Sequence, residues 1–332
     1  MFISIFKTIL SVFLSVLCFF TSPVFGKFAE PIQPKDAENV RMTFAAISDI
    51  HMTDSALRQG MLELGLYDMA NAERRLDAYL MLGDNTDHGE PEQYDRLIAA
   101  MSKYDIADTV LLAEGNHDPW TTDESGADDT AAAQQNFIDF NTTAAGREID
   151  KVYYSTEVNG YPFIFLGSEG SGVAAYISDE QLSWLRAEMD AAAATGKPIF
   201  VISHWPFKGT HGLPKTFGER DYDEWTGSLG EQNDAVEAIV KDYDNVFYMS
   251  GHNHAGFAND NAEKIYGYNS FETEGSLHRI NLPSFMYMSI FGRISNGTGF
   301  VVEVYDDEVV FRARSFSAGV WYTFNEASFP LV

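Results

Sequence analysis

The chain of 332 residues is 45% hydrophobic and carries a formal net charge of −27. A chain of this length and apolar content can bury the core of one large α/β domain or of two small ones. The acidity argues against a nucleic acid polymer or an anionic membrane as a partner, because both would be repelled.

The first 26 residues have the pattern of a secretory signal peptide. A nearly uninterrupted apolar stretch, Ile9 to Phe20, precedes the small residue Gly26 at a plausible cleavage point. The alternative is an uncleaved membrane anchor, because the apolar stretch approaches the length that spans a bilayer. We therefore expect a secreted or periplasmic protein, or a membrane-anchored one if the leader is retained. The single cysteine, Cys18, lies in this segment, so the mature chain would have no disulfide.

Residues 27–40 are polar and contain two prolines, which predicts a linker before a domain over residues 41–332. Strands and helices alternate at the start of this domain. We predict strands over Met42–Ser48, Tyr79–Leu82 and Val110–Ala113, and helices over Ala56–Asp77 and Pro91–Lys103. Such alternation is typical of parallel strands joined by crossover helices. Ligands of these sheets collect at the carboxyl ends of the strands.

The rest of the chain becomes richer in strands. We predict helices near Ala131–Phe140, from the capping residue Ser178 through Ala194, and over Ala235–Asp242, and strands over Val152–Ser155, Tyr161–Leu166, Ile199–Ile202, Val246–Met249, Phe285–Ile290, Phe300–Tyr305 and Val309–Arg314. The first two of these strands would form a hairpin around Asn159-Gly160. Residues 206–232 form a long loop, and loops of that length are often functional.

Five short segments carry side chains that bind metals, and each follows an apolar run. They are Asp49-Ile50-His51, Gly83-Asp84-Asn85-Thr86-Asp87, Gly115-Asn116-His117-Asp118, Ser203-His204-Trp205 and Gly251-His252-Asn253-His254. Imidazole and carboxylate groups bind transition ions, and an asparagine carbonyl can supplement them. Each motif alone could be only a turn. Together, in this order and at the ends of predicted strands, they predict a site for two ions that one carboxylate bridges.

A pair of ions about 3.5–4 Å apart suits phosphoryl transfer, because it can clamp both the attacking and the leaving oxygen. It also lowers the pKa of a bound water toward about 7, which supplies hydroxide at neutral pH. Two divalent ions, two aspartates and one hydroxide leave a small positive charge that attracts a phosphoester anion.

The order of the five motifs resembles the calcineurin-like metallophosphoesterase superfamily, over nearly all of residues 42–320. The resemblance implies an α/β (α+β) fold in which a β-sandwich is flanked by helices, in four αββα layers. It implies two divalent or trivalent transition metal ions as cofactors, with Fe, Mn and Zn all suited to these ligands. Neither the identity of the ions nor the oligomeric state follows from the sequence.

The resemblance also assigns roles, motif by motif. Asp49, His51 and His254 would bind the first ion, Asn116, His204 and His252 the second, and Asp84 would bridge both. His117 would not be a ligand. In the family this histidine lies over the site and stabilises or protonates the leaving group. Asp118 could orient His117, or it could simply close the turn.

One position departs from the purple acid phosphatases, which have a tyrosine ligand three residues after the bridging aspartate. Asp87 occupies that position here, and we expect it to stabilise the loop or to support a ligand. His88 and His211 lie outside the motifs, and we expect both to be exposed. The alternative for His211 is a lid over the metals that also contains Trp205, Arg220 and Trp225, with Arg220 gripping phosphate.

The function that follows is hydrolysis of a small phosphoester, in which a metal-activated hydroxide attacks phosphorus and His117 assists the leaving group. We favour a phosphodiester over a phosphomonoester, because bacterial members of the family with this single-domain layout resemble cyclic-nucleotide and glycerophosphodiester hydrolases. The charge disfavours a polynucleotide. A phosphomonoesterase or nucleotidase is one alternative. A catalytically silent binding protein of the same fold is another, although such proteins usually lack ligands or the histidine equivalent to His117, and this chain retains them all.

Overall fold

The computed structural model describes residues 30–122, 129–213, 215, 227–257, 267–286 and 297–332. The described strands are β1 (Met42–Ile47), β2 (Leu76–Leu82), β3 (Ala107–Ala113), β4 (Tyr154–Val158), β5 (Tyr161–Phe165), β6 (Ile199–Ile202), β7 (Val246–Ser250), β8 (Phe271–Glu274), β9 (Leu277–Asn281), β10 (Thr298–Val304), β11 (Glu308–Ser315) and β12 (Val320–Pro330). The described α-helices are α2 (Ala56–Ala70), α3 (Pro91–Met101), α4 (Thr130–Ala145), α5 (Asp179–Ala193) and α6 (Asn233–Lys241), and a 3₁₀ turn, η2 (Gly230–Gln232), precedes α6.

These strands form two sheets. The first has the order β12-β11-β10-β1-β2-β3, and the second has the order β4-β5-β6-β7-β9-β8. In the first sheet β1, β2 and β3 are parallel, and β10, β11 and β12 continue it with antiparallel pairing. In the second sheet β5, β6, β7 and β9 are parallel, while β4 and β8 are antiparallel edge strands. The predicted parallel start and strand-rich finish are therefore confirmed.

The largest hydrophobic core lies between the two sheets. The ring of Phe44, on β1, packs edge-on against Phe163 of β5 and Phe200 of β6, with centroids 5.5 and 5.4 Å apart. All three side chains are fully buried, and Phe247 of β7 extends the same cluster. Because these rings come from both sheets, the sheets pack face to face.

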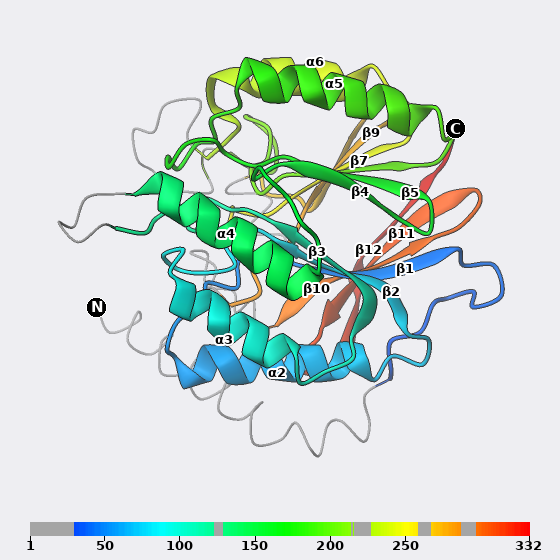
Figure 1. Cartoon of the computed structure of the whole chain (residues 1–332). Helices are drawn as coiled ribbons and strands as arrows, with labels where there is room; N and C mark the ends of the chain where they lie inside the picture. The colour runs from blue at the N-terminus through cyan, green and yellow to red at the C-terminus, as the bar shows by residue number, and fades with distance from the viewer. Residues whose placement is uncertain (1–29, 123–128, 214, 216–226, 258–266, 287–296) are drawn as a thin grey trace.

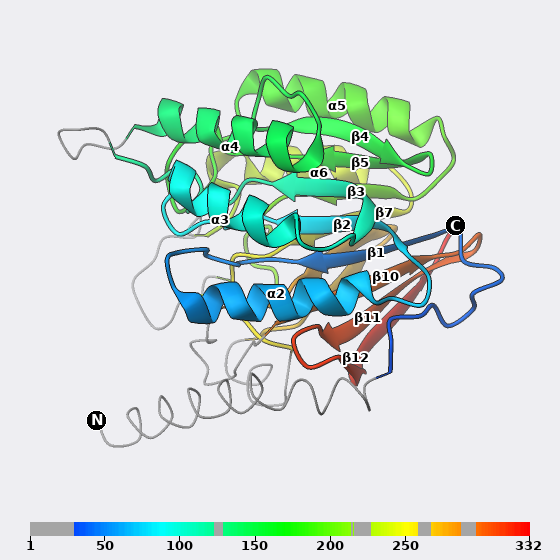
Figure 2. The same ribbon diagram turned by 60° about the horizontal axis from the view of Figure 1, so that its bottom comes forward.

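Alternate residues of the strands point outward, where the helices cover them. On β1 the residues next to Phe44 and Ala46, namely Ala45 and Ile47, join a second cluster with Leu62 of α2 and Leu97 of α3. A third cluster lies between the second sheet and helices α5 and α6. Strands buried on both faces read as continuous apolar runs, as the sequence shows. Figures 1 and 2 show α2, α3 and α4 on one side of the sandwich and α5 and α6 on the other, which confirms the four αββα layers.

Helix α2 is shorter than the sequence predicts. It ends at Ala70 rather than Asp77, because the Asn71 side chain donates to the carbonyl of Tyr67 and the chain then turns into β2. Arg75 reaches across to the carbonyl of Ala107 at 2.6 Å, which holds the beginning of β2 beside β3. The residues between Ala70 and β2 favour a helix locally, so this tertiary contact could not be read from them.

Other predictions in the second half had mixed outcomes. The hairpin is confirmed, with Asn159 and Gly160 at φ of 52° and 75°, as a type I′ turn requires. The strand predicted over Phe285–Ile290 is wrong at its start, because Phe285 and Met286 lie in a bend, and residues 287–290 lie outside the described residues. Strands β8, β9 and β12 were not predicted.

The N-terminal segment is described from Glu30 onward, so the predicted leader over residues 1–26 lies outside the described residues. The described part of the predicted linker, residues 30–40, lies against the domain: Ile32 and Val40 are buried, and the carbonyl of Gln33 accepts a hydrogen bond from Arg312. No helix among the described residues is long and apolar enough to cross a membrane.

Candidate metal centre

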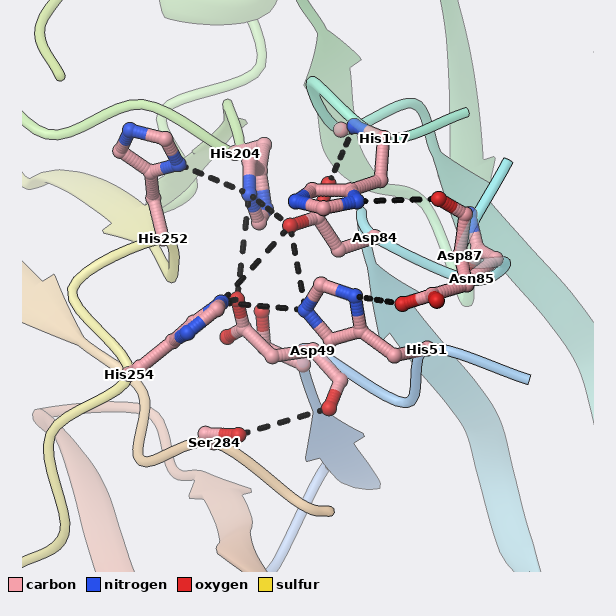
Figure 3. A network of polar contacts seen from close by, with 12 residues as sticks. Asp49, His51, Asp84, Asn85, Asp87, His117, His204, His252, His254 and Ser284 are labelled. Atoms are coloured by element: carbon pink, nitrogen blue, oxygen red, sulfur yellow. Dashed lines mark hydrogen bonds and ion pairs between the residues drawn. The ribbon is translucent and has the colours of Figure 1, made fainter. Parts of the chain in front are cut away.

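The five predicted motifs meet at one edge of the sandwich. Asp49 and His51 follow β1, Asp84 follows β2, Asn116 and His117 follow β3, His204 follows β6, and His252 and His254 follow β7. These strands are parallel within each sheet, so their carboxyl ends gather there, as expected for ligand sites. Figure 3 shows the labelled side chains converging from both sheets.

Asp84 lies between two groups of side chains. Its Oδ2 atom is 3.3 Å from Nε2 of His51 and 3.3 Å from Nε2 of His204. On the His51 side, Nε2 of His254 is 3.0 Å from Nε2 of His51 and 3.2 Å from Oδ1 of Asp49. On the other side, Nδ1 of His252 is 3.3 Å from Nε2 of His204. Asp84 thus belongs to both groups, which is the geometry expected of a bridging carboxylate.

These spacings fit metal ions better than they fit hydrogen bonds alone. Two nitrogens that bind one ion at about 2.0–2.1 Å lie roughly 3 Å apart. The pairs His51–His254 and His204–His252 have separations of 3.0 and 3.3 Å. Oδ2 of Asp49 and Oδ1 of Asn116 are buried and accept no hydrogen bond from the described residues. Buried polar atoms are normally satisfied, so a cation is a natural partner for these oxygens.

The backbone is strained at the same place. Asp49, His51, Asp84, His252 and His254 all have positive φ, between 46° and 67°. A side chain in this left-handed region costs about 1–3 kcal/mol and persists where the surroundings enforce it. Such strain gathers at functional sites, and here it turns five predicted ligands toward one another.

Two glycines allow the loops to approach closely. A Cβ atom on Gly83 would lie 2.5 Å from Nδ1 of His204, and one on Gly115 would lie 2.1 Å from the backbone nitrogen of Asp84. Neither distance is tolerable for a carbon atom. The glycines of the Gly-Asp and Gly-Asn-His-Asp motifs are therefore needed for packing between the loops.

Hydrogen bonds behind the cluster orient its rings. Nδ1 of His204 donates to the carbonyl of Leu82 at 3.0 Å, which turns Nε2 toward Asp84. Nδ1 of His51 is 3.2 Å from Oδ1 of Asp87, with the same effect. The expectation that Asp87 supports a ligand agrees with this contact. Such partners fix the tautomer of a ligand and raise its basicity.

Burial and opposite charges shift the pKa values of the cluster. Burial disfavours charge on His204 and His254, yet the nearby carboxylates outweigh it and raise the pKa of each to about 9. Burial alone would raise the pKa of Asp84, but the surrounding histidines, His204 foremost, hold it well below its usual range. Burial lowers the pKa of His51 to about 4. Without metal, the positive charges of His204 and His254 thus balance the negative charges of Asp49 and Asp84.

His117 stands beside this cluster rather than within it. Its backbone nitrogen donates to Oδ1 of Asp84 at 2.8 Å, and its ring packs edge-on against that of His51, with centroids 4.5 Å apart. Nδ1 of His117 donates to the carbonyl of Asp87 at 3.0 Å. Asp87 therefore holds both His51 and His117, through its side chain and its backbone.

Asp118 closes the turn. Its carboxylate accepts hydrogen bonds from the backbone nitrogens of Gly115 and Thr86, the side chain of Asn85 and the hydroxyl of Tyr94, all between 2.9 and 3.2 Å. The contact that orients the His117 ring comes from Asp87 instead. Of the two roles considered for Asp118, the hydrogen bonds therefore favour the structural one over a catalytic one.

The histidines outside the motifs differ from each other. His88 is exposed, as expected. His211 is buried, with 1% exposure, so the prediction of an exposed side chain is wrong. Its Nδ1 lies 2.5 Å from the carbonyl of Asn269, and its backbone nitrogen donates to Glu272. Trp205 is also fully buried, which removes it from the suggested lid, and Arg220 and Trp225 lie outside the described residues.

The fold and the clustered motifs define a candidate binding site for metal ions, and comparison with known proteins gives the family of the chain. The family model of the calcineurin-like phosphoesterases matches residues 42–256. The chain therefore belongs to the calcineurin-like phosphoesterase family.

Among individual proteins, a probable cyclic nucleotide phosphodiesterase of Rhodococcus erythropolis is 30% identical over 174 residues, which are 47% of this chain and 52% of that protein. The chain thus matches about half the length of this curated relative. A dimetal phosphatase of Danio rerio has a similar structure, with a TM-score of 0.58, 15% identity, and coverage of 89% of this chain and 100% of that one. A purple acid phosphatase from yellow lupin (Lupinus luteus) seeds has a TM-score of 0.54 at 12% identity, covering 87% and 53%. At these identities the two structures show a shared fold alone.

Proposed function

We propose that this protein is a phosphodiesterase for small substrates, in which Asp49, His51 and His254 hold one ion, Asn116, His204 and His252 hold the other, and Asp84 bridges them. The proposal is carried by the position of Asp84, whose Oδ2 lies 3.3 Å from ring nitrogens of both groups. When bound, the ions would supply positive charge that stabilises the phosphoryl oxygens, and they would lower the pKa of a bound water toward about 7.

The residues of the chain then have distinct tasks. Two of the ligand rings are already oriented, because Asp87 holds the ring of His51 and the carbonyl of Leu82 holds the ring of His204. His117 donates a proton from Nε2 to the leaving oxygen, since its Nδ1 is engaged by the carbonyl of Asp87. The transfer leaves His117 neutral with Nδ1 still protonated, so the hydrogen bond to Asp87 persists through the reaction.

Two observations support a small diester as the substrate. The relative from Rhodococcus erythropolis is described as a probable cyclic nucleotide phosphodiesterase. The net charge of −27 would repel a polynucleotide, whereas a single phosphodiester meets mainly the local field of the ions.

We also propose, from the apolar stretch Ile9–Phe20, that the protein is exported and acts outside the cytoplasm.

The test is an activity panel on the protein with Mn²⁺, Zn²⁺ or Fe²⁺ added. Bis-p-nitrophenyl phosphate and adenosine 3′,5′-cyclic phosphate are compared with p-nitrophenyl phosphate, and Asp84→Ala and His117→Ala serve as inactive controls. We expect turnover of the diesters that both substitutions abolish. Turnover of the monoester alone would assign a phosphomonoesterase, and no turnover with two bound ions would favour a silent binding protein.

A further inference from the structure

Trp120 is in ring contact with His117. The indole ring is tilted against the imidazole, with centroids 4.2 Å apart and an interplanar angle of 46°. The backbone nitrogen of Trp120 donates to the carbonyl of His117 at 3.3 Å, so one turn fixes both residues. Trp120 is only half-buried. A large planar side chain is thus accessible directly beside the proposed general acid.

The indole also fastens a neighbouring loop, residues 168–176, which follows β5. Nε1 of Trp120 donates to the carbonyl of Ser171 at 3.1 Å, and Nε1 of Trp205 donates to the carbonyl of Val173 at 2.9 Å. Within the loop, Oγ of Ser168 accepts from the backbone nitrogen of Tyr176 at 3.0 Å. Two tryptophans from two different metal-bearing loops therefore hold loop 168–176 at the same edge of the sandwich.

Loop 168–176 exposes apolar groups. Val173 has 43% of its surface exposed and Tyr176 has 53%, although most large apolar side chains of the described chain are buried. Sites for small molecules are typically lined by apolar and aromatic side chains with a few polar groups. The hydrogen bonds that hold this loop would keep its conformation in place before a ligand arrives, which reduces the cost of binding.

We propose that Trp120 and loop 168–176 form the subsite for the leaving group, and that Trp120 stacks on a planar part of that group, such as the base of a nucleoside whose ribose oxygen leaves phosphorus. The inference rests on the proposed function and names its substrate class more closely. A leaving oxygen within about 2.6–3.2 Å of His117 brings the atoms attached to it next to the indole, because the two rings are in contact.

The competing role for Trp120 is support of His117 alone. A supporting residue would affect every substrate equally, whereas a stacking residue affects only substrates with a planar group. The test therefore uses two substrates with the same reacting centre, adenosine 3′,5′-cyclic phosphate and ribose 3′,5′-cyclic phosphate, which lacks the base. Trp120→Leu removes the aromatic face, Trp120→Phe keeps one, and Trp184→Phe, in α5, is the control.

We expect Trp120→Leu to lower kcat/KM for the adenosine compound by about 5- to 150-fold more than for the ribose compound, the range that loss of one base–aromatic stack produces. Trp120→Phe should retain most of the preference, and Trp184→Phe all of it. Equal losses on the two substrates, or no loss on either, would overturn the inference.

A binding measurement separates this inference from the proposed function. Affinities of the metal-loaded protein for the Rp-phosphorothioates of adenosine 3′,5′-cyclic phosphate and of ribose 3′,5′-cyclic phosphate are measured by titration calorimetry. We expect the wild type to prefer the adenosine compound and Trp120→Leu to lose that preference. If the wild type has no preference, the inference fails even where bis-p-nitrophenyl phosphate is hydrolysed. If that diester is not hydrolysed, the proposed function fails, and the two affinities still decide the role of Trp120.

Discussion

The buried histidines predict how the metal-free protein responds to alkaline pH. His204 and His254 each have a pKa near 9, compared with an ordinary value of 6.5, because Asp49 and Asp84 stabilise their charged forms. When folding raises the pKa of a group, the group contributes its full stabilisation at pH values below its pKa in the unfolded chain. That stabilisation is lost as the pH rises through its pKa in the folded protein. The metal-free protein should therefore become less stable between pH 6.5 and pH 9.

The size of the effect follows from the same values. For one group, a rise from 6.5 to about 9 corresponds to about 3 kcal/mol. Both rings interact with the Asp84 carboxylate, so their contributions do not simply add, and we expect a total of about 3–5 kcal/mol. His51 contributes little in this window, because it is neutral in the folded protein, where its pKa is about 4, and mostly neutral in the unfolded chain above pH 6.5.

The assay is urea unfolding at pH 6.5, 7.5, 8.5 and 9.5, in chelator and in excess Mn²⁺. In chelator the free energy of unfolding should fall across the series, with a smaller fall in His254→Gln than in the exposed control His88→Gln. With Mn²⁺ the curve should be flatter, because the ions replace the protons. A free energy of unfolding that stays constant or rises with pH in chelator would refute this reasoning.

Three further substitutions test particular contacts. Asp118→Ala leaves several buried hydrogen-bond donors without an acceptor and should lower the free energy of unfolding, measured by urea titration, by at least about 3 kcal/mol. The control Asp95→Ala, at an exposed position, should change the free energy of unfolding by less than about 0.5 kcal/mol. Asp87→Ala removes the partner of His51 and should weaken metal binding by about 10- to 100-fold in a chelator competition; an unchanged affinity would make that contact incidental. Phe44→Ala leaves a cavity between the sheets and should lower the free energy of unfolding by about 3–5 kcal/mol, measured by thermal unfolding of the protein in chelator. A loss below about 1 kcal/mol would mean that the sheets close over the cavity.

The loops that carry the predicted ligands could be predicted because local sequence specifies them. Each begins where an apolar strand ends, and parallel strands place such ends at one edge. The bridging position of Asp84 came from the resemblance, and the structure brings its carboxylate within 3.3 Å of a ring from either sheet. The sandwich also came from the resemblance, and the structure agrees with it, because Phe44 faces the core between the sheets while the adjacent Ala45 faces the helices.

What could not be predicted depends on partners distant in sequence. His211 can be buried because its backbone nitrogen bonds to Glu272 and its Nδ1 atom bonds to the carbonyl of Asn269. These partners lie about 60 residues away, so the local sequence does not predict the contacts. The hydrogen bonds of Asp118 to the loop after β2 and of Trp120 to the loop after β5 also join residues that are distant in sequence. Strand β9 lies beside β7 in parallel, although the segment between them has no helix that the structure describes.

The sharing of Asp84 between two ions can be tested by crystallography of the protein grown with Mn²⁺, using anomalous scattering to locate the ions. Two anomalous peaks about 3.5–4 Å apart are expected. Both should contact Asp84, with His51 and His254 on one side and His204 and His252 on the other. A single peak, or a pair of peaks that Asp84 does not join, would contradict the bridged dinuclear site.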